Sequence, residues 1–177
     1  MRRPNQERDS RLVAIVGPES SGKSTLAKEL AQRYRGVWLP EYARGALPGT
    51  SYEETDVAMI AREQLAREND FCEAEPTFGV LDTDGIVLQI WFKVRFGHVP
   101  EFLLRHIASQ NPREYLLTYR DLPWEPDPQR ESKDDLTALF DLYETTLQAW
   151  RFDYQVVRGI GERRVKNALD LLNAQRA

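Results

Sequence analysis

The sequence predicts an α/β fold in which a five-stranded parallel sheet is covered by helices on both faces. Short apolar segments rich in β-branched residues alternate along the chain with longer segments whose apolar residues recur every three or four positions. Strands that alternate with helices form parallel sheets, because each connection crosses back over the sheet. The chain has 177 residues, of which 41% are hydrophobic, so it can form a single domain with a substantial core.

The expected elements follow from this alternation. Strands are expected at residues 12–16, 37–39, 78–85, 114–119 and 154–157, each of which is a short apolar segment. Helices are expected after residue 23, from Ser51 to about Cys72, and over 86–96, 101–108, 136–150 and 164–172. Ser51 and Glu54 fit a capping box for the second of these helices. Segment 86–96 is too apolar for an exposed helix, so we expect it to be buried or to line a pocket.

Two segments are expected to lie outside the packed elements. Residues 1–10 are polar and charged, which predicts a flexible tail ahead of a single domain over 11–177. The segment "RDLPWEPDPQRESKDD", which begins at Arg120, is rich in proline and charged residues and cannot form a core element. A long loop of this kind, over about 120–134, is typical of a lid that closes over bound substrates.

A Gly-rich segment between the first strand and the first helix fits a phosphate-binding pattern. Gly17, Gly22, Lys23 and Ser24 fill G-x-x-x-x-G-K-[ST], the P-loop, whose alternative is a turn that only caps a helix. The helix N-terminus offers unpaired N–H groups and a positive dipole, which together bind a polyphosphate. Lys23 is expected to reach the β- and γ-phosphates, and the Ser24 hydroxyl to bind magnesium. The expected nucleotide-binding residues are Gly17, Pro18, Glu19, Ser20, Ser21, Gly22, Lys23, Ser24 and Thr25.

Acidic residues follow the second and third strands. Glu41 lies after the second strand, and Asp82 and Asp84 lie at the end of the third. Because the carboxyl ends of parallel strands meet at one edge, these acids are expected near a bound triphosphate. Asp82 is expected to hold magnesium with Ser24, and Glu41 to accept the proton of an attacking hydroxyl, although the two roles could be exchanged. Asp84 equally well caps the helix that follows it.

Several other residues are candidates for an acceptor site or for catalysis. Arg44 either contacts the acceptor or forms a surface ion pair with an acid. Arg130 is expected to close over the transferring phosphoryl group, with a solvated charge as the alternative, and Arg120 fits either description. Trp124 and Trp91 can stack on a planar ring, although core packing is favoured for Trp91 because its segment is so apolar.

Composition and charge exclude several classes of function. The net charge of −4 provides no basic field for nucleic acid, and no apolar run approaches the roughly twenty residues that a membrane span needs. The polar N-terminus lacks an apolar export segment, and the single cysteine, Cys72, suits a reducing compartment. His98 and His106 have no partners at metal-ligand spacing. We therefore expect a soluble cytoplasmic protein with no nucleic-acid or membrane partner.

An ordered set of segments from Val13 to Leu172 resembles a known family. "GPESSGKSTLA", "WLPEYAR", "IAREQLARE", "LDTD" and "DLPWEPDPQR" are similar to the ribosylnicotinamide kinase domain of bifunctional NAD-biosynthesis regulators. The resemblance implies a three-layer P-loop kinase fold and transfer of the γ-phosphate of ATP, with Mg²⁺, to the 5′-hydroxyl of nicotinamide riboside. It implies Lys23, Glu41, Asp82 and Arg130 as catalytic residues, Ser24 and Asp82 as metal ligands, and Glu41, Tyr42, Arg44, Asp84, Trp91 and Trp124 as acceptor-site residues.

Two other functions fit the same motifs. One is a kinase for another nucleoside or for a nucleoside monophosphate, since one fold serves many acceptors. A monophosphate acceptor would want several fixed arginines, whereas "EYAR" supplies only Arg44. The other is a nucleotide-binding ATPase switch that contacts a partner. The sequence lacks the N-K-x-D segment that guanine-specific switches carry.

Overall fold

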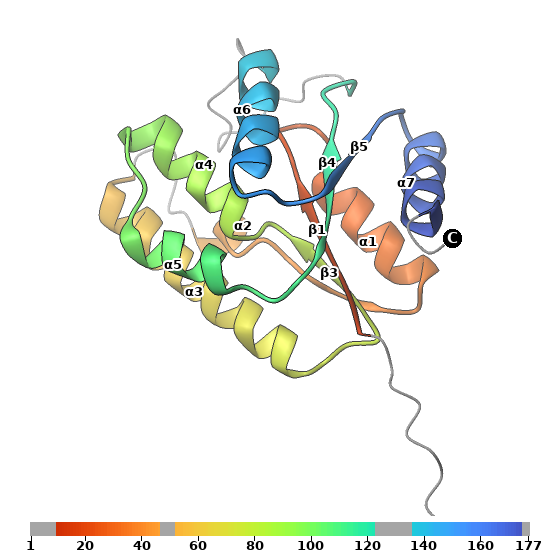
Figure 1. The fold of residues 1–177 in the computed structure, drawn as a ribbon, viewed down its shortest axis with the longest axis horizontal. Helices are drawn as coiled ribbons and strands as arrows, with labels where there is room; N and C mark the ends of the chain where they lie inside the picture. The colour runs from red at the N-terminus through yellow and green to blue at the C-terminus, as the bar shows by residue number, and fades with distance from the viewer. Residues whose placement is uncertain (1–9, 47–51, 123–135, 175–177) are drawn as a thin grey trace, which may run out of the picture.

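The sheet is parallel throughout and has the number of strands that the sequence predicts. The computed structural model describes residues 10–46, 52–122 and 136–174. Its strands are β1 (Arg11–Val16), β2 (Val37–Leu39), β3 (Phe78–Asp82), β4 (Glu114–Thr118) and β5 (Tyr154–Val157). They form one five-stranded sheet in the order β2-β3-β1-β4-β5, with every neighbouring pair parallel (Figure 1). The predicted α/β fold with a five-stranded parallel sheet is confirmed.

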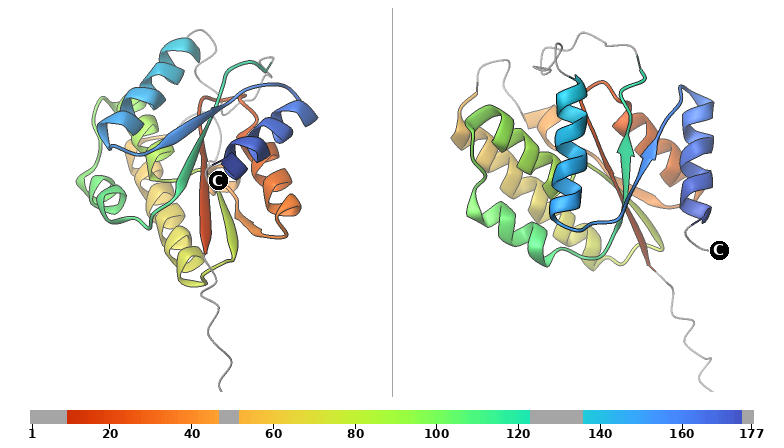
Figure 2. Two further views of the ribbon diagram at one scale, coloured as in Figure 1. Left: turned by 45° about the vertical axis from the view of Figure 1, so that its right-hand side comes forward. Right: turned by 45° about the horizontal axis from the view of Figure 1, so that its top comes forward.

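Helices cover both faces of this sheet, which gives three layers (Figures 1 and 2). The helices are α1 (Lys23–Arg33), α2 (Ala43–Ala46), α3 (Glu54–Glu73), α4 (Gly85–Phe96), α5 (Glu101–Ser109), α6 (Leu136–Ala149) and α7 (Glu162–Ala174). One core packs α1 and α7 against the sheet, and the other packs α3, α4, α5 and α6 against the opposite face.

The central strand β1 has a continuous run of apolar residues because both of its faces are covered. Val13 and Ile15 belong to the core under α1 and α7, whereas Leu12, Ala14 and Val16 belong to the core on the other face. Successive side chains of a strand point to opposite faces, so a strand covered on both sides needs apolar residues at every position. All six residues of β1 are buried. The end of β1, where the P-loop begins, is therefore fixed from both sides.

The start of α3 differs from the expected one. The helix begins at Glu54 with Glu53 as its N-cap, and Glu53 forms a capping box with Asp56, whose carboxylate accepts the Glu53 N–H at 2.8 Å. The expected capping box of Ser51 with Glu54 is therefore wrong, and Ser51 itself lies outside the described residues. Both pairs have a three-residue spacing, so the pattern alone could not choose between them.

The topology brings the ends of β1, β2 and β3, and the loops that follow them, to one edge of the sheet. The P-loop lies between β1 and α1, Glu41 lies between β2 and α2, and Asp82 is the last residue of β3. The expected tail over residues 1–10 and the expected lid over about 120–134 lie mostly outside the described residues, so both stay predictions. Among the helices of the described ranges, none is both long and apolar enough to cross a bilayer.

Candidate functional site

The P-loop connects β1 to α1 through two glycines with positive φ. Gly17 has a φ of +141°, and a Cβ there would collide with Thr118 Oγ1 and approach the Thr118 carbonyl oxygen to 2.8 Å. Gly22, the N-cap of α1, has a φ of +78°. Glycine is the residue that adopts such angles without a steric penalty and allows so close an approach to β4. The sequence pattern therefore reflects both backbone conformation and packing against a neighbouring strand.

Hydroxyl groups tie the P-loop to the end of β4. Ser21 Oγ donates to the Pro18 carbonyl at 2.6 Å and lies 2.6 Å from Thr118 Oγ1. Thr118 Oγ1 donates to the Val16 carbonyl at 3.0 Å. Within the described residues, α1 has no side-chain hydrogen bond at its N-cap, so the N–H groups of its first turn can bind an anion. Thr118 was not recognised from the sequence, because nothing in its local pattern distinguishes it from other strand residues.

Lys23 lies over the P-loop at the start of α1. Its Nζ donates to the carbonyl oxygens of Gly17 and Pro18, both at 2.9 Å. Burial lowers the pKa of Lys23, and the nearby carboxylates, above all Glu41 and then Asp82, oppose this effect. The arrangement places a cation beside the positive end of a helix, where it raises the attraction for a polyanion.

Asp82 and Ser24 provide the oxygens that could hold a metal ion. Ser24 Oγ and Asp82 Oδ1 are buried, and neither has a hydrogen-bond partner of normal geometry in the described part of the chain. Burial raises the pKa of Asp82, the Ser24 hydroxyl lowers it, and the charge of Glu41 raises it further, so these groups lie close together. Buried polar atoms are nearly always paired, and two unpaired oxygens of this kind suit Mg²⁺, which in kinases takes few protein ligands.

Glu41 and Arg44 form an ion pair at the same edge of the sheet. Arg44 Nε donates to Glu41 Oε2 at 3.0 Å, and the Arg44 side chain is 53% exposed. Arg44 therefore forms the ion pair that was expected as the alternative to a contact with the acceptor. Because the Arg44 side chain is largely exposed, this ion pair contributes little to the stability of the fold. The next residue, Tyr42, donates its backbone N–H to Gln64 Oε1 at 2.8 Å, and the Arg67 guanidinium lies 4.3 Å from the centre of its ring.

Asp84 caps the helix that follows it, which is one of the two roles expected for it. Its Oδ1 accepts the Ile86 N–H at 2.9 Å, and its Oδ2 accepts the Tyr115 hydroxyl at 2.7 Å. The residue is completely buried in the free protein, and its role in acceptor binding stays a prediction. The preceding Thr83 has a φ of +90°, a strained value for a β-branched residue, and strain of this kind clusters at functional sites.

The two tryptophans that the sequence singled out have different outcomes. Trp91 donates its Nε1–H to the Tyr52 hydroxyl at 3.0 Å and contacts that ring edge-on. Trp91 also packs against the core that α3, α4, α5 and α6 form on one face of the sheet, and core packing was the role favoured for it. Trp124 and Arg130 lie outside the described residues, so their roles stay predictions.

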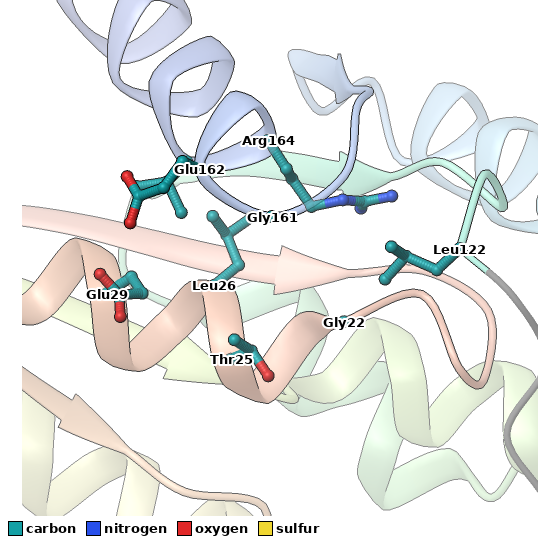
Figure 3. A pocket seen from close by; sticks show the side chains of 9 residues that line it. Gly22, Thr25, Leu26, Glu29, Leu122, Gly161, Glu162 and Arg164 are labelled. Atoms are coloured by element: carbon teal, nitrogen blue, oxygen red, sulfur yellow. The ribbon is translucent and has the colours of Figure 1, made fainter.

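A pocket of about 410 Å³ opens beside the P-loop, between α1 and α7 (Figure 3). Its walls include Gly22, Thr25 and Leu26 at the start of α1, Leu122 after β4, and Gly161, Arg164 and Val165 at the start of α7. The pocket is next to the P-loop. It lies on the face of the sheet that α1 and α7 cover, whereas α3 covers the other face, and Glu41 follows β2 at the far edge of the sheet from β5. Sequence reasoning missed this pocket, because its walls come from three distant segments.

Two further residues at this edge were also missed. Tyr143 of α6 is 4% exposed, and burial followed by the charges of Glu41 and Glu19 raises its pKa well above the ordinary value. Tyr143 therefore lies within electrostatic range of Glu41, on the helix that follows the expected lid. Gln64 of α3 is 1% exposed and supports the segment after Glu41. Both residues lie at buried positions of their helices. In the sequence, only the polar group at a position expected to be buried could have marked them as site residues.

Comparison with solved structures gives proteins of the same fold. A structure of NadR protein in complex with NAD and AMP-PNP has a TM-score of 0.73 and 20% identity, covering 93% of this chain and 49% of that chain. A structure of NadR in complex with NR has a TM-score of 0.75 at the same identity and coverage. This chain therefore spans about half the length of the NadR chains that it matches. Deoxyadenosine kinase from M. mycoides with bound dATP has a TM-score of 0.65 and 14% identity, covering 92% of this chain and 99% of that one.

At these identities, the likenesses show the fold alone, which is that of P-loop nucleoside and nucleotide kinases. No curated protein sequence matches this chain. The family described as the AAA domain matches residues 12–164, a span that runs from β1 into the first turn of α7 and includes the P-loop, Glu41 and Asp82. Because this match covers most of the chain, the protein belongs to the AAA-domain family of P-loop proteins.

Proposed function

We propose that this protein is an ATP- and Mg²⁺-dependent kinase that phosphorylates the 5′-hydroxyl of nicotinamide riboside to give nicotinamide mononucleotide. The observation that carries the proposal is the convergence of Lys23, Ser24, Glu41 and Asp82 at one edge of the sheet, within electrostatic range of one another. A phosphate-binding loop, a pair of metal-binding oxygens and a separate carboxylate are the parts that phosphoryl transfer needs.

The P-loop residues bind the triphosphate in this proposal. The N–H groups at the start of α1 donate to phosphate oxygens, and Lys23 Nζ exchanges its bonds to the Gly17 and Pro18 carbonyls for bonds to the β- and γ-phosphates. Ser24 Oγ and Asp82 Oδ1, which have no hydrogen bond of normal geometry within the described residues, would hold Mg²⁺. When bound, Mg²⁺ neutralises charge on the phosphates.

Glu41 is the proposed general base. The acceptor oxygen forms a bond to the γ-phosphorus, the bond from that phosphorus to the β-phosphate oxygen breaks, and the hydroxyl proton passes to the Glu41 carboxylate. Arg44 Nε, 3.0 Å from Glu41 Oε2, orients that carboxylate toward the acceptor. ADP then leaves with the negative charge that Lys23 stabilises.

The pocket between α1 and α7 is the proposed site for the nucleoside part of ATP. It lies beside Gly22, so a nucleotide whose phosphates occupy the P-loop can place its base there. Its volume of about 410 Å³ suits a nucleoside, and Leu26, Leu122 and Val165 provide apolar walls for a planar ring. This placement leaves the opposite side of the P-loop, toward Glu41, for the acceptor.

Nicotinamide riboside is proposed as the acceptor because of the resemblance of "EYAR", "DTD" and "DLPW" to nicotinamide riboside kinases. A solved NadR structure in complex with NR has the same fold. The physical argument is that the ring of nicotinamide riboside is cationic, so an indole face favours it over neutral bases by about 0.5–2 kcal/mol. Trp124 is the proposed contact, and Arg130 is proposed to close over the γ-phosphate.

A kinase for another nucleoside or for a monophosphate is the second candidate. Deoxyadenosine kinase from M. mycoides and thymidylate kinase from Candida albicans share the fold, with TM-scores of 0.65 and 0.63. Against a monophosphate acceptor, Arg44 is already paired with Glu41 and "EYAR" supplies no second arginine.

The test is release of ADP across a panel of acceptors in the presence of MgATP. The panel contains nicotinamide riboside, thymidine, deoxyadenosine, cytidine, shikimate and thymidine monophosphate. We expect the highest kcat/KM with nicotinamide riboside. Faster turnover of another acceptor would support the second candidate, and ADP release that no acceptor accelerates would support an ATPase switch.

A further inference from the structure

Arg164, at the start of α7, is a buried arginine that the function proposed above does not use. It is 4% exposed, and its guanidinium group makes a set of hydrogen bonds to distant parts of the chain. Nε donates to the Gly159 carbonyl at 2.7 Å, Nη1 donates to the Ser21 carbonyl at 2.9 Å, and Nη2 donates to the Tyr119 carbonyl at 2.9 Å and to Asp121 Oδ1. The other oxygen of Asp121 accepts the Gly159 N–H at 2.6 Å.

These bonds join the three segments that form the walls of the pocket. Ser21 precedes Gly22, Asp121 precedes Leu122, and Gly159 lies just ahead of Gly161. Figure 3 shows the Arg164 side chain extending from α7 toward the loop that carries Leu122. Arg164 and Asp121, which we call the clamp, therefore connect the P-loop with both of the other walls.

The P-loop also has anchors that do not involve the clamp. Ser21 Oγ is held by the Pro18 carbonyl and lies beside Thr118 Oγ1, and Thr118 is fixed in β4. Loss of the clamp would therefore leave the phosphate-binding N–H groups in place. Without the clamp, the loop after β4 and the loop before α7 would no longer be held in place relative to the P-loop.

We propose that Arg164 and Asp121 are positioning residues that fix the base pocket relative to the P-loop, and that they thereby increase the affinity for a nucleoside triphosphate over that for its phosphate chain alone. The inference rests on the proposed function only in taking the pocket as the base site. A ligand that contacts two walls of the pocket binds more tightly when both walls are already held in place, because less conformational freedom is lost on binding. A ligand that contacts only the P-loop does not gain affinity in this way.

The chemistry of the guanidinium group explains why an arginine is needed. Its planar group offers five N–H donors in a fixed arrangement, so one side chain can bond to carbonyls of three segments and to a carboxylate. A lysine offers a single nitrogen and cannot reach all four partners. Arg164→Lys keeps the charge and removes the bridging, while Asp121→Asn keeps the shape and removes the charge of the partner.

The experiment measures binding of two ligands, with magnesium, by isothermal titration calorimetry. The ligands are a non-hydrolysable ATP analogue, which spans the P-loop and the pocket, and inorganic tripolyphosphate, which reaches only the P-loop. The proteins are the wild type, Arg164→Lys, Asp121→Asn and the control Arg163→Ala, which changes an exposed arginine of the same helical turn. Circular dichroism checks folding, and Asp121→Asn carries the test if Arg164→Lys fails to fold.

We expect both clamp variants to bind the ATP analogue about tenfold more weakly, which corresponds to about 1.4 kcal/mol. Binding of tripolyphosphate should change by less than about threefold, and the control should match the wild type with both ligands. Equal losses for the two ligands, or no loss for either, would overturn the inference and leave the proposed function standing. Failure of the wild type to bind the ATP analogue would instead overturn the proposed function.

Discussion

Ser24 Oγ and Asp82 Oδ1 are buried close to each other, and neither has a hydrogen bond of normal geometry within the described residues. Such atoms cost roughly 1–3 kcal/mol each when they are left unpaired in a folded protein. The carboxyl group is also in an unfavourable environment, since burial raises the pKa of Asp82 and the charge of Glu41 adds to the effect. A bound magnesium ion would relieve both costs, so the first prediction concerns this pair.

Asp82→Asn should lower kcat/KM for MgATP by about 100-fold, because it removes the charge of the carboxylate that we propose as a ligand of the ion while keeping the shape of the side chain. The variant should need a higher magnesium concentration for half-maximal activity, which a magnesium titration at fixed ATP measures. Ser24→Ala should shift the same midpoint in the same direction. An unchanged magnesium midpoint in Asp82→Asn would remove Asp82 from the metal site.

Glu41→Gln should lower kcat by about 10²- to 10⁴-fold, the usual range for a general base, while the magnesium midpoint stays at the wild-type value. The amide cannot accept the proton, yet it keeps the size of the side chain beside Arg44. Steady-state kinetics at several magnesium concentrations separates the two acids. If magnesium rescues Glu41→Gln and not Asp82→Asn, their roles are the reverse of those proposed.

Lys23→Ala should lower kcat/KM by about 10³-fold without loss of the fold, because the change removes a charge that stabilises the transition state. Burial lowers the pKa of Lys23, so the ammonium ion is not a source of stability in the free protein. The midpoint of thermal unfolding should therefore stay at or above the wild-type value. Activity within about tenfold of the wild type in a folded variant would show that the loop does not act as a catalytic P-loop.

Glu68→Gln should destabilise the fold by about 2 kcal/mol at pH 7, because it removes the closer of the two carboxylates that face the buried Arg113 and leaves only Asp84 Oδ2, at 3.6 Å. Arg113 Nη1 lies 2.7 Å from Glu68 Oε1, and both side chains are 1% exposed. Burial acts to raise the pKa of Glu68, but the hydrogen bond with His106 and the charge of Arg113 outweigh it, so the pKa is lowered.

The lowered pKa sets the direction of the pH dependence for this residue. The stabilisation by Glu68 is present above the unfolded-state pKa, near 4.5, and is lost as the pH falls through the folded-state value. The difference between wild type and Glu68→Gln in urea unfolding should therefore be largest at pH 6–7 and shrink below about pH 4.5. A difference that stays constant down to pH 3 would show that the charge of Glu68 does not contribute.

Local patterns in the sequence predicted the fold because the determinants of each element are close in the chain. β1 is apolar at each position after Arg11, and the P-loop pattern requires only eight consecutive residues, from Gly17 to Ser24. The capping box of α3 was misplaced because two overlapping segments have the same spacing. The four-residue helix α2, which follows Glu41 and Tyr42, was not predicted, because it is too short to show a period.

The parts of the site that the sequence did not predict depend on contacts between distant residues. Arg164 and the Ser21 carbonyl are 143 residues apart, and Gln64 and Tyr42 are 22 residues apart. The hydrogen bond from the Tyr115 hydroxyl, on β4, to Asp84 Oδ2 joins residues that are 31 positions apart in the sequence. Contacts between side chains that are far apart in the sequence produce no fixed residue spacing, so a sequence pattern cannot predict them.

The most direct measurement is transfer of label from ATP that carries ³²P in the γ-position to nicotinamide riboside. Wild type and Lys23→Ala are compared, with and without the acceptor, and the products are separated by chromatography. A kinase with Glu41 as base should place the label in nicotinamide mononucleotide, with one labelled mononucleotide for each ADP formed, and Lys23→Ala should form this product about 10³-fold more slowly. Label that appears only as inorganic phosphate, at a rate unaffected by nicotinamide riboside, would contradict the proposed function.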